Sequence, residues 1–385
     1  MPGAISRCRN EKMDVMDKPV TYDAPAPKAG ILDIAPYVGG KSKIDGVAEP
    51  IKLSSNENAL GCSAMAAAAF SEAQSKLFRY PDGHANPLRA AVAAYHDLEP
   101  ERLIFGNGSD EVFGLLNQTY LEAGDNIVTG EHGFLAYRIS ALACQAQVRL
   151  APEPDLRVDI DNLLELVDAR TKLVYISNPA NPTGTWNTPE EISDLRSRLA
   201  SDIILVIDEA YAEFVDEPTW ESALEMARGH DNIVVTRTFS KIHGLAGLRV
   251  GFGYCPKPLI DAMDRIRMPF NINLPAQAAA VAALSDRAHI DASRAQVTLW
   301  RPRLIQAIRS FGLEVGNSAG NFVLIRFRDA AEAARANEFL MEQGLIVRHV
   351  VNYGLPQCLR VTVGKDAENE AFLEALGRFA RVSER

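Results

Sequence analysis

The feature that most constrains this fold is a series of short apolar runs, each followed by a polar or glycine-containing segment. The run from Ile203 to Ile207 has five apolar residues in a row and is followed by Asp208. Such an unbroken run is typical of a strand that is buried on both faces of a sheet. Strand signals of this kind alternate with helix signals from about residue 52 to residue 255. The alternation predicts an α/β fold with a mostly parallel sheet covered by helices.

The pattern changes after residue 255. Two predicted amphipathic helices alternate there with three short predicted strands, over 298–311, 322–325, 330–343, 345–347 and 359–363. An alanine-rich stretch from Pro275 to Ala283 precedes them and marks a hinge region. We therefore expect three parts, which are an N-terminal arm (1–50), a large domain (51–283) and a small C-terminal α/β domain (284–385).

Composition limits the class of partner. The chain of 385 residues is 47% hydrophobic, which is enough for a large core, and its formal net charge is −10. This charge argues against nucleic acid and anionic membranes as partners. The five cysteines form no Cys-x-x-Cys pair and the histidines show no metal-ligand spacing, so no metal site is predicted. Reduced thiols, and about 28 initial residues without an apolar core, favour a cytoplasmic protein with a loose N-terminal arm.

One lysine stands between hydroxyl side chains and a glycine-rich stretch. Thr238 and Ser240 precede Lys241, and Arg249 follows it eight positions later. A lysine amine forms a Schiff base with an aldehyde, and hydroxyls and a guanidinium are donors for a phosphate. The grouping therefore suits an aldehyde cofactor that also carries a phosphate. Taken alone, it is more typical of a glycine-rich turn with a surface lysine.

Asp208 ends the predicted strand, at the edge where open α/β sheets bind their ligands. A carboxylate there keeps a nearby ring nitrogen protonated, because a negative charge favours the cation. A pyridine cofactor needs this protonation to accept an electron pair. The alternative roles are a helix cap for Asp208 and half-buried packing for Tyr211, three positions later.

Two loops complete the set of candidate binding segments. Asn181 lies in a rigid loop of two Asn-Pro pairs over 178–184, where its amide suits a ring oxygen of the cofactor or merely a tight turn. The second loop runs through Gly106 and Gly108 into a predicted helix that begins near Ser109 and Asp110. A helix N-terminus offers free N–H groups to a phosphate, although Ser109 or Asp110 also suits a plain helix cap.

With these four segments in this order, the chain resembles the fold type I pyridoxal-phosphate aminotransferases. Within that family it is most similar to the histidinol-phosphate aminotransferases. The resemblance extends from about Pro36 to about Gly377. It implies pyridoxal 5'-phosphate as the cofactor, amino-group transfer with ping-pong kinetics, and a homodimer.

The resemblance also implies a role for individual residues. Lys241 corresponds to the lysine that bonds the cofactor and then moves a proton, and Asp208 to the partner of the pyridine nitrogen. The other matched positions are Tyr211 and Asn181 at the phenolic oxygen, Phe134 stacked on the ring, Ser109, Asp110, Thr238, Ser240 and Arg249 at the phosphate, Tyr80 at the phosphate of the neighbouring subunit, and Arg360, Arg348 and Tyr37 at the substrate.

The substrate is less constrained than the reaction. Arginine binds carboxylates and phosphates in the same bidentate way, so Arg360 suits both glutamate and histidinol phosphate. The first expectation is therefore a histidinol-phosphate:2-oxoglutarate aminotransferase of histidine biosynthesis. An aromatic amino-acid aminotransferase is the alternative, because an apolar pocket separates imidazole from phenyl rings only modestly. A threonine-phosphate decarboxylase, which is a lyase, is a further alternative that the same lysine and aspartate allow. A cofactor-bound transcription regulator is a fourth, although the N-terminal arm is too short and not basic enough for a DNA-binding domain.

Overall fold

The computed structural model describes residues 25–383, so the first 24 residues of the expected arm lie outside the described residues. Its main feature is a seven-stranded sheet with the order β2-β8-β7-β6-β5-β3-β4. The strands are β2 (Leu103–Gly106), β3 (Asn126–Gly130), β4 (Gln147–Ala151), β5 (Thr171–Ser177), β6 (Ile204–Asp208), β7 (Ile233–Thr238) and β8 (Gly251–Tyr254). β8 runs in the opposite direction to the other six strands. The prediction of an α/β fold with a mostly parallel sheet is therefore confirmed.

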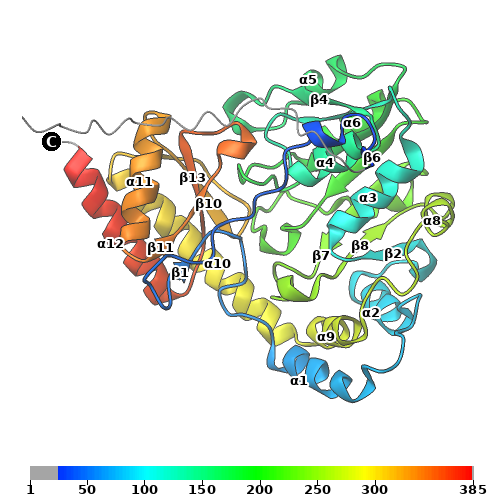
Figure 1. Cartoon of the computed structure of the whole chain (residues 1–385), viewed down its shortest axis with the longest axis horizontal. Helices are drawn as coiled ribbons and strands as arrows, with labels where there is room; N and C mark the ends of the chain where they lie inside the picture. The colour runs from blue at the N-terminus through cyan, green and yellow to red at the C-terminus, as the bar shows by residue number, and fades with distance from the viewer. Residues whose placement is uncertain (1–24, 384–385) are drawn as a thin grey trace, which may run out of the picture.

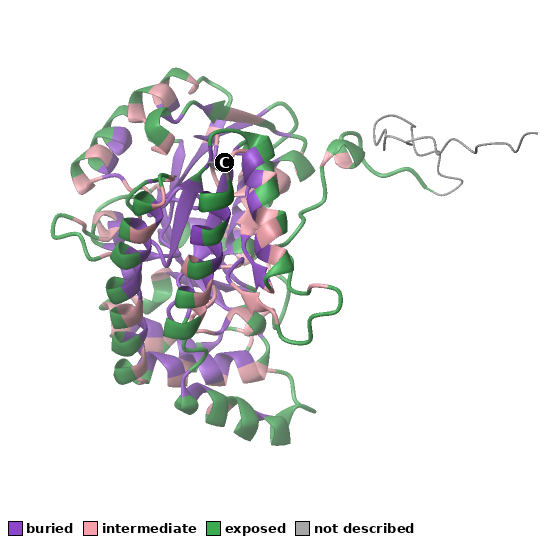
Figure 2. Cartoon of the chain, turned by 90° about the vertical axis from the view of Figure 1, so that its left-hand side faces the viewer, coloured by how far each residue is buried: buried purple, intermediate pink, exposed green. Residues whose placement is uncertain are grey.

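The position of β6 in the middle of the sheet explains why its sequence is continuously apolar. Leu205 and Ile207 pack into the core on one face of the sheet, and Ile204 and Val206 into the core on the other. Helices cover both faces, so neither set of side chains meets water. Figure 2 shows this as buried residues on the central strands and exposed residues on the outer sides of the helices.

The helices around this sheet belong to two layers. Buried residues of α3 (Ser109–Tyr120), α4 (Leu135–Ala143) and α8 (Lys257–Met263) share one core. The other core takes residues from α1 (Ala64–Ala73), α2 (Asn86–His96), α5 (Ile160–Glu165), α6 (Pro189–Arg198), α7 (Ala223–Arg228) and α9 (Leu274–Ser285). This is a three-layer arrangement, with the carboxyl ends of β5, β6 and β7 at one edge of the sheet (Figure 1).

The C-terminal third builds a second, antiparallel sheet with its own core. Its strand order is β12-β13-β10-β9, formed by β9 (Glu314–Val315), β10 (Phe322–Arg326), β12 (Arg348–His349) and β13 (Cys358–Thr362). Its helices are α10 (Arg287–Ser310), α11 (Ala330–Glu342) and α12 (Asp366–Ser383). The predicted helix over 298–311 is therefore only the second half of α10. That helix begins eleven positions earlier, where the Asp286 side chain accepts a hydrogen bond from the His289 N–H.

The first strand of the chain lies beside the C-terminal part and not in the large sheet. β1 (Ile51–Lys52) pairs in parallel with β11 (Leu345–Ile346), and the two lie side by side in Figure 1. The segment before β1 contacts the same region, because the Val38 carbonyl accepts a hydrogen bond from Arg348 at 2.7 Å. The division into an arm, a large domain and a small domain with the boundaries given above stays a proposal. Among the described residues, no helix has both the length and the apolar character needed to cross a membrane.

Candidate active site

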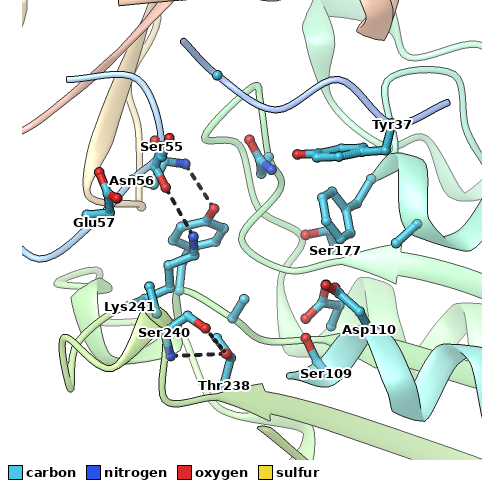
Figure 3. Close-up of a pocket in the computed structure, with 18 of the residues that line it drawn as sticks. Tyr37, Ser55, Asn56, Glu57, Ser109, Asp110, Ser177, Thr238, Ser240 and Lys241 are labelled. Carbon is cyan, nitrogen blue, oxygen red and sulfur yellow. Dashed lines mark hydrogen bonds between the residues drawn. The ribbon is translucent and has the colours of Figure 1, made fainter. Parts of the chain in front are cut away.

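A cavity of about 620 Å³ opens at the carboxyl ends of β5, β6 and β7. Its lining includes every predicted site residue except Tyr80, which are Tyr37, Ser109, Asp110, Phe134, Asn181, Asp208, Tyr211, Thr238, Ser240, Lys241, Arg249, Arg348 and Arg360. Figure 3 shows how several of these side chains converge from segments that are far apart in the sequence. The fold therefore brings the candidate residues together in one site.

Lys241 reaches into the cavity from the loop that follows β7. Its Nζ donates a hydrogen bond to the Ser55 carbonyl at 3.3 Å and lies 5.6 Å from the centre of the Tyr211 ring (Figure 3). The amine is held by a single, long hydrogen bond and by no carboxylate in the described part of the chain. It is therefore free to react with a carbonyl group brought into the cavity.

Asp208 is the last residue of β6 and is 4% exposed. Its carboxylate accepts hydrogen bonds from the Tyr137 hydroxyl at 2.6 Å and from the Thr236 hydroxyl at 3.2 Å. Burial raises the pKa of Asp208 to about 6, against the lowering effect of these two hydrogen bonds. A cationic partner in the cavity would offset the cost of this buried charge.

Tyr211 and Asn181 both line the cavity and are held by different neighbours. The Tyr211 hydroxyl accepts a hydrogen bond from the Asn56 amide at 2.9 Å. Asn181 Oδ1 accepts one from the Arg360 guanidinium. Both residues are buried, so these contacts fix the side chains before any ligand is bound.

The residues that were predicted to bind a phosphate form a cradle around the start of α3. Gly108 is the N-cap residue of α3, and no side chain caps the first N–H groups there. Thr238 Oγ1 lies 3.0 Å from Ser240 Oγ, and Arg249 Nη1 lies 3.4 Å from the same oxygen. Free N–H groups, hydroxyls and a guanidinium are the donors that a phosphate needs.

Two glycines let the parts of the cradle approach one another. A Cβ on Gly108 would lie 2.4 Å from Arg249 Nη2, and its φ of +80° is also unfavourable for other residues. A Cβ on Gly251 would lie 2.3 Å from the Ser109 nitrogen. Arg249 is further fixed by Asp110, whose carboxylate lies 3.1 Å from its Nη2. The Arg249 guanidinium can therefore lie at the N-terminus of α3, since the two glycines place no side chain there.

Phe134 precedes α4 and offers an aromatic face to the cavity. Its ring centre lies 5.7 Å from that of Tyr137, in an edge-on contact. Tyr137 is fully buried and stacks on Tyr175 with ring centres 4.7 Å apart. This aromatic group supports both Phe134 and, through the Tyr137 hydroxyl, Asp208.

The two arginines of the second sheet region are neighbours across paired strands. Arg348 of β12 stands opposite Arg360 of β13. Arg360 is 6% exposed, donates to the Ser54 carbonyl at 2.8 Å, and its Nε has no partner among the described residues. Burial lowers its pKa. With Tyr37, which lines the same cavity, the pair forms a site suited to an anionic substrate group.

Tyr80 does not join the site of its own chain. It is 82% exposed and stacks on Phe270 with ring centres 4.8 Å apart. His243, two residues after Lys241, is a packing residue. It is buried against Phe239, does not line the cavity, and burial lowers its pKa to about 4.

Sequence reasoning did not identify several residues of the site. Asn56, Tyr137 and Thr236 each hydrogen-bond a predicted residue. Thr236 had a usable signal, because it pairs with Asp208 in the register of neighbouring strands. Asn56 and Tyr137 had none, because their partners lie 155 and 71 positions away.

Comparisons with known proteins agree with this geometry. The chain is 57% identical over 355 residues to histidinol-phosphate aminotransferase 1 of Caulobacter vibrioides, which covers 92% of this chain and 99% of the relative. It is 48% identical to the histidinol-phosphate aminotransferase of Maricaulis maris, over 92% of this chain and 99% of the relative. The crystal structure of the Sinorhizobium meliloti histidinol-phosphate aminotransferase, in complex with pyridoxal-5'-phosphate, superposes with a TM-score of 0.86 at 28% identity, over 94% of this chain and 99% of that chain.

The family model for aminotransferases of class I and II matches residues 48–376, which include the cavity-lining segments from β6, β7 and β13. A match over this much of the chain, together with relatives of this identity, shows that the protein is an enzyme that transfers amino groups. The chain belongs to the class I and II aminotransferases.

Proposed function

We propose that this aminotransferase uses pyridoxal 5'-phosphate to move an amino group between histidinol phosphate and 2-oxoglutarate, in the cytoplasm, as a step of histidine biosynthesis. The observation that carries the proposal is one cavity that holds a free lysine, a buried carboxylate, a phosphate cradle and two arginines. The names of the relatives support the substrate. Free thiols at all four cysteines of the described chain are compatible with a reducing compartment.

The donor groups of the cavity match the cofactor. The uncapped start of α3, with Arg249 and the hydroxyls of Thr238 and Ser240, supplies donors for a phosphate dianion. Asp208 suits a protonated pyridine nitrogen, because burial makes its ionised form costly unless a cation lies beside it. When bound, pyridoxal phosphate supplies an aldehyde for amines and a ring that accepts the electron pair from the substrate Cα.

Each of these residues would then have a separate role in the reaction. With pyridoxal phosphate bound, Lys241 would hold its aldehyde carbon, and the amine of Lys241, once displaced by the substrate amine, would be placed to take the proton from Cα. Tyr211 and Asn181 would contact the phenolic oxygen, and Phe134 would pack on the ring. Asp208, in its ionised form, would keep the ring nitrogen charged.

Arg360 and Arg348 would bind the anionic group of the substrate, with Tyr37 beside them. A guanidinium binds a phosphate or a carboxylate through the same parallel N–H bonds. One site therefore serves histidinol phosphate in one half of the reaction and glutamate in the other. Two substrates that use the same cavity in turn give ping-pong kinetics.

We also propose that the enzyme is a homodimer in which Tyr80 reaches the cofactor phosphate of the neighbouring subunit. An exposed apolar group supports this, because Phe78, Tyr80 and Met268 are 77%, 82% and 69% exposed, and Tyr80 stacks on Phe270. Clustered large apolar side chains at a surface mark a contact site between proteins. Light scattering on the purified enzyme would test this, and a monomer at micromolar concentration would contradict it.

Separate half-reactions test the substrate. Histidinol phosphate, glutamate and phenylalanine are added one at a time to the cofactor-loaded enzyme, and the loss of its absorption band is followed. Fast loss with the first two and slow loss with phenylalanine is the expected result. Fast loss with phenylalanine and none with histidinol phosphate would move the assignment to an aromatic amino-acid aminotransferase. Release of carbon dioxide from threonine phosphate would identify the lyase instead.

A further inference from the structure

Three successive residues at the start of the large domain each contact a different residue of the site. The Ser54 carbonyl accepts a hydrogen bond from Arg360 at 2.8 Å, and the Ser55 carbonyl accepts one from Lys241 at 3.3 Å. The Asn56 amide donates to the Tyr211 hydroxyl at 2.9 Å. Among these contacts the one made by Asn56 is distinctive, because it is made by a side chain and determines how a hydroxyl proton is used.

The position of Asn56 is fixed from several directions. Asn56 is 1% exposed, and its φ of +55° places it in the left-handed region, which asparagine tolerates better than most residues. Its N–H donates to Thr362 Oγ1 at 2.9 Å, and its carbonyl accepts from Asn321 at 3.1 Å. Thr362 is the last residue of β13 and Asn321 directly precedes β10, so the backbone of Asn56 is held from outside its own segment.

The same contacts orient the amide group. The Thr362 hydroxyl already accepts from the Asn56 N–H, so its own proton is available for Asn56 Oδ1, which lies 3.2 Å away. With Oδ1 turned to Thr362, Nδ2 is left facing Tyr211. Figure 3 shows the Asn56 side chain reaching toward the interior of the site, beside Ser55 and Lys241. The amide therefore reaches Tyr211 as a donor.

A donor at the Tyr211 oxygen has a consequence for the hydroxyl proton. A phenol hydroxyl has one proton to give, and it accepts through its oxygen. Because Asn56 occupies the oxygen as a donor, it cannot take that proton. In the described part of the chain the Tyr211 hydroxyl donates to no acceptor. Its proton is therefore left for a ligand in the cavity.

We propose that Asn56 is a positioning residue that directs the Tyr211 hydroxyl proton to the phenolic oxygen of the bound cofactor. This rests on the proposed function, in which Tyr211 contacts that oxygen. A hydrogen bond donated to an ionised oxygen stabilises the ionised form. Without Asn56 the Tyr211 hydroxyl is free to turn away from the phenolic oxygen. That oxygen then carries more negative charge, so the proton on the nearby nitrogen that joins Lys241 to the cofactor is held more tightly.

Asn56→Gly is the test variant, because glycine keeps the positive φ and removes only the amide. The probe is pyridoxal phosphate bound to the whole enzyme, and the readout is the midpoint of the pH titration of its absorption band. We expect the midpoint to rise by about one pH unit and the dissociation constant of the cofactor to rise about tenfold. Asn369→Gly is the matched control, because Asn369 is also 1% exposed and its amide bonds only Gly364.

Asn56→Asp covers the case in which the glycine variant fails to fold. Aspartate tolerates the same backbone conformation but replaces the donor by an acceptor. The Tyr211 hydroxyl would then donate to the new carboxylate and away from the cofactor, so the midpoint is again expected to rise. A loss of stability without a change in the midpoint would show a merely structural role and overturn the proposal.

A double-mutant cycle with Tyr211→Phe decides whether Asn56 acts through Tyr211. Tyr211→Phe alone should raise the midpoint, and adding Asn56→Gly to it should change nothing further. An equal shift by Asn56→Gly in both backgrounds would overturn the proposal and leave the cofactor role of Tyr211 intact. An unchanged midpoint in Tyr211→Phe would overturn both that role and the proposal.

Discussion

The two walls of the cavity place their side chains by different means. On the wall formed by the large sheet, Asp208 ends β6, while Lys241 follows the end of β7, and the two strands are held in register by the sheet. On the other wall, Arg348 and Arg360 stand within short antiparallel strands. Asn56 lies outside any helix or strand.

The first wall supplies the reactive groups, and the second wall supplies contacts that orient the residues of the site. The sheet edge supplies the amine and the carboxylate, because parallel strands bring their carboxyl ends to one edge. The second wall depends on hydrogen bonds between distant segments, such as that between Asn56 and Thr362, 306 positions apart. We expect substitutions on the first wall to remove a step of the reaction and those on the second to weaken binding or alignment.

Lys241→Ala should give the largest effect. In the proposed mechanism this change removes both the group that bonds the cofactor and the base that moves the proton, so we expect turnover to fall by about 10⁴-fold or more. Steady-state transfer from glutamate measures this. Lys257→Ala is the control, since Lys257 is exposed and pairs only with Asp261. Activity near that of the wild type in Lys241→Ala would contradict the mechanism.

Substitution of the two arginines of the second wall should lower kcat/KM by different amounts. Arg360→Lys should lower kcat/KM about 100-fold, because lysine cannot make the parallel bonds of a buried guanidinium. Arg348→Lys should lower it about fivefold, because Arg348 is only half-buried and already donates to Val38. Both variants are assayed with histidinol phosphate and with glutamate. Equal losses in the two variants would mean that the arginines share the anion.

How far the sequence predicted the site shows the same division. The α/β fold, Asp208 and Lys241 were predictable because each depends on a local pattern, which is an apolar run and the polar residues after it. Asn56 and Tyr137 were not predictable, because what matters is which distant residue their hydrogen bonds meet. The start of α10 was missed for a related reason, since its first turns carry few apolar residues to mark the helical period.

Tyr137→Phe tests how the first wall is supported. The Tyr137 hydroxyl donates to Asp208 at 2.6 Å and lowers its pKa, so its loss should raise the pKa of Asp208 above the present value of about 6. In the proposed function the ionised carboxylate pairs with the ring nitrogen of the cofactor, so we expect the affinity for the cofactor at pH 7 to fall about tenfold. Tyr175→Phe is the control, because Tyr175 is equally buried and its hydroxyl donates to Asn117. Equal losses in both variants would refute a role for the Asp208 bond.

The same carboxylate predicts a pH dependence of the cofactor-free enzyme. The folded pKa of Asp208 is raised from 3.8 to about 6, so its contribution to stability is fully present below pH 3.8 and is lost as the pH rises to about 6. The loss corresponds to roughly 3 kcal/mol for this fully buried group. Asp208→Asn should remove it, so the melting temperatures of variant and wild type should diverge in favour of the variant between pH 4 and pH 6. A constant difference across this range would contradict the raised pKa.

An effect as small as that of Arg348→Lys is expected at Tyr80, a residue that lies in neither wall of the cavity of its own chain. Tyr80→Phe should weaken cofactor binding about fivefold, since in the proposed homodimer it removes one of several donors to the phosphate of the neighbouring subunit's cofactor. The informative experiment is a mixed dimer. When a Tyr80→Phe subunit pairs with a Lys241→Ala subunit, the one complete Lys241 site receives the intact Tyr80 of its neighbour, so its affinity should match that of the wild type.

The reverse mixture decides the matter. When both changes are placed in one subunit and the other is wild type, the complete site receives the substituted phenylalanine from its neighbour and should show the fivefold loss. If Tyr80 served its own subunit, the two mixtures would exchange results. The exposed position of Tyr80, stacked on Phe270 and absent from the cavity lining, favours the first outcome, because a hydroxyl outside its own site can serve only a cavity that another chain brings to it.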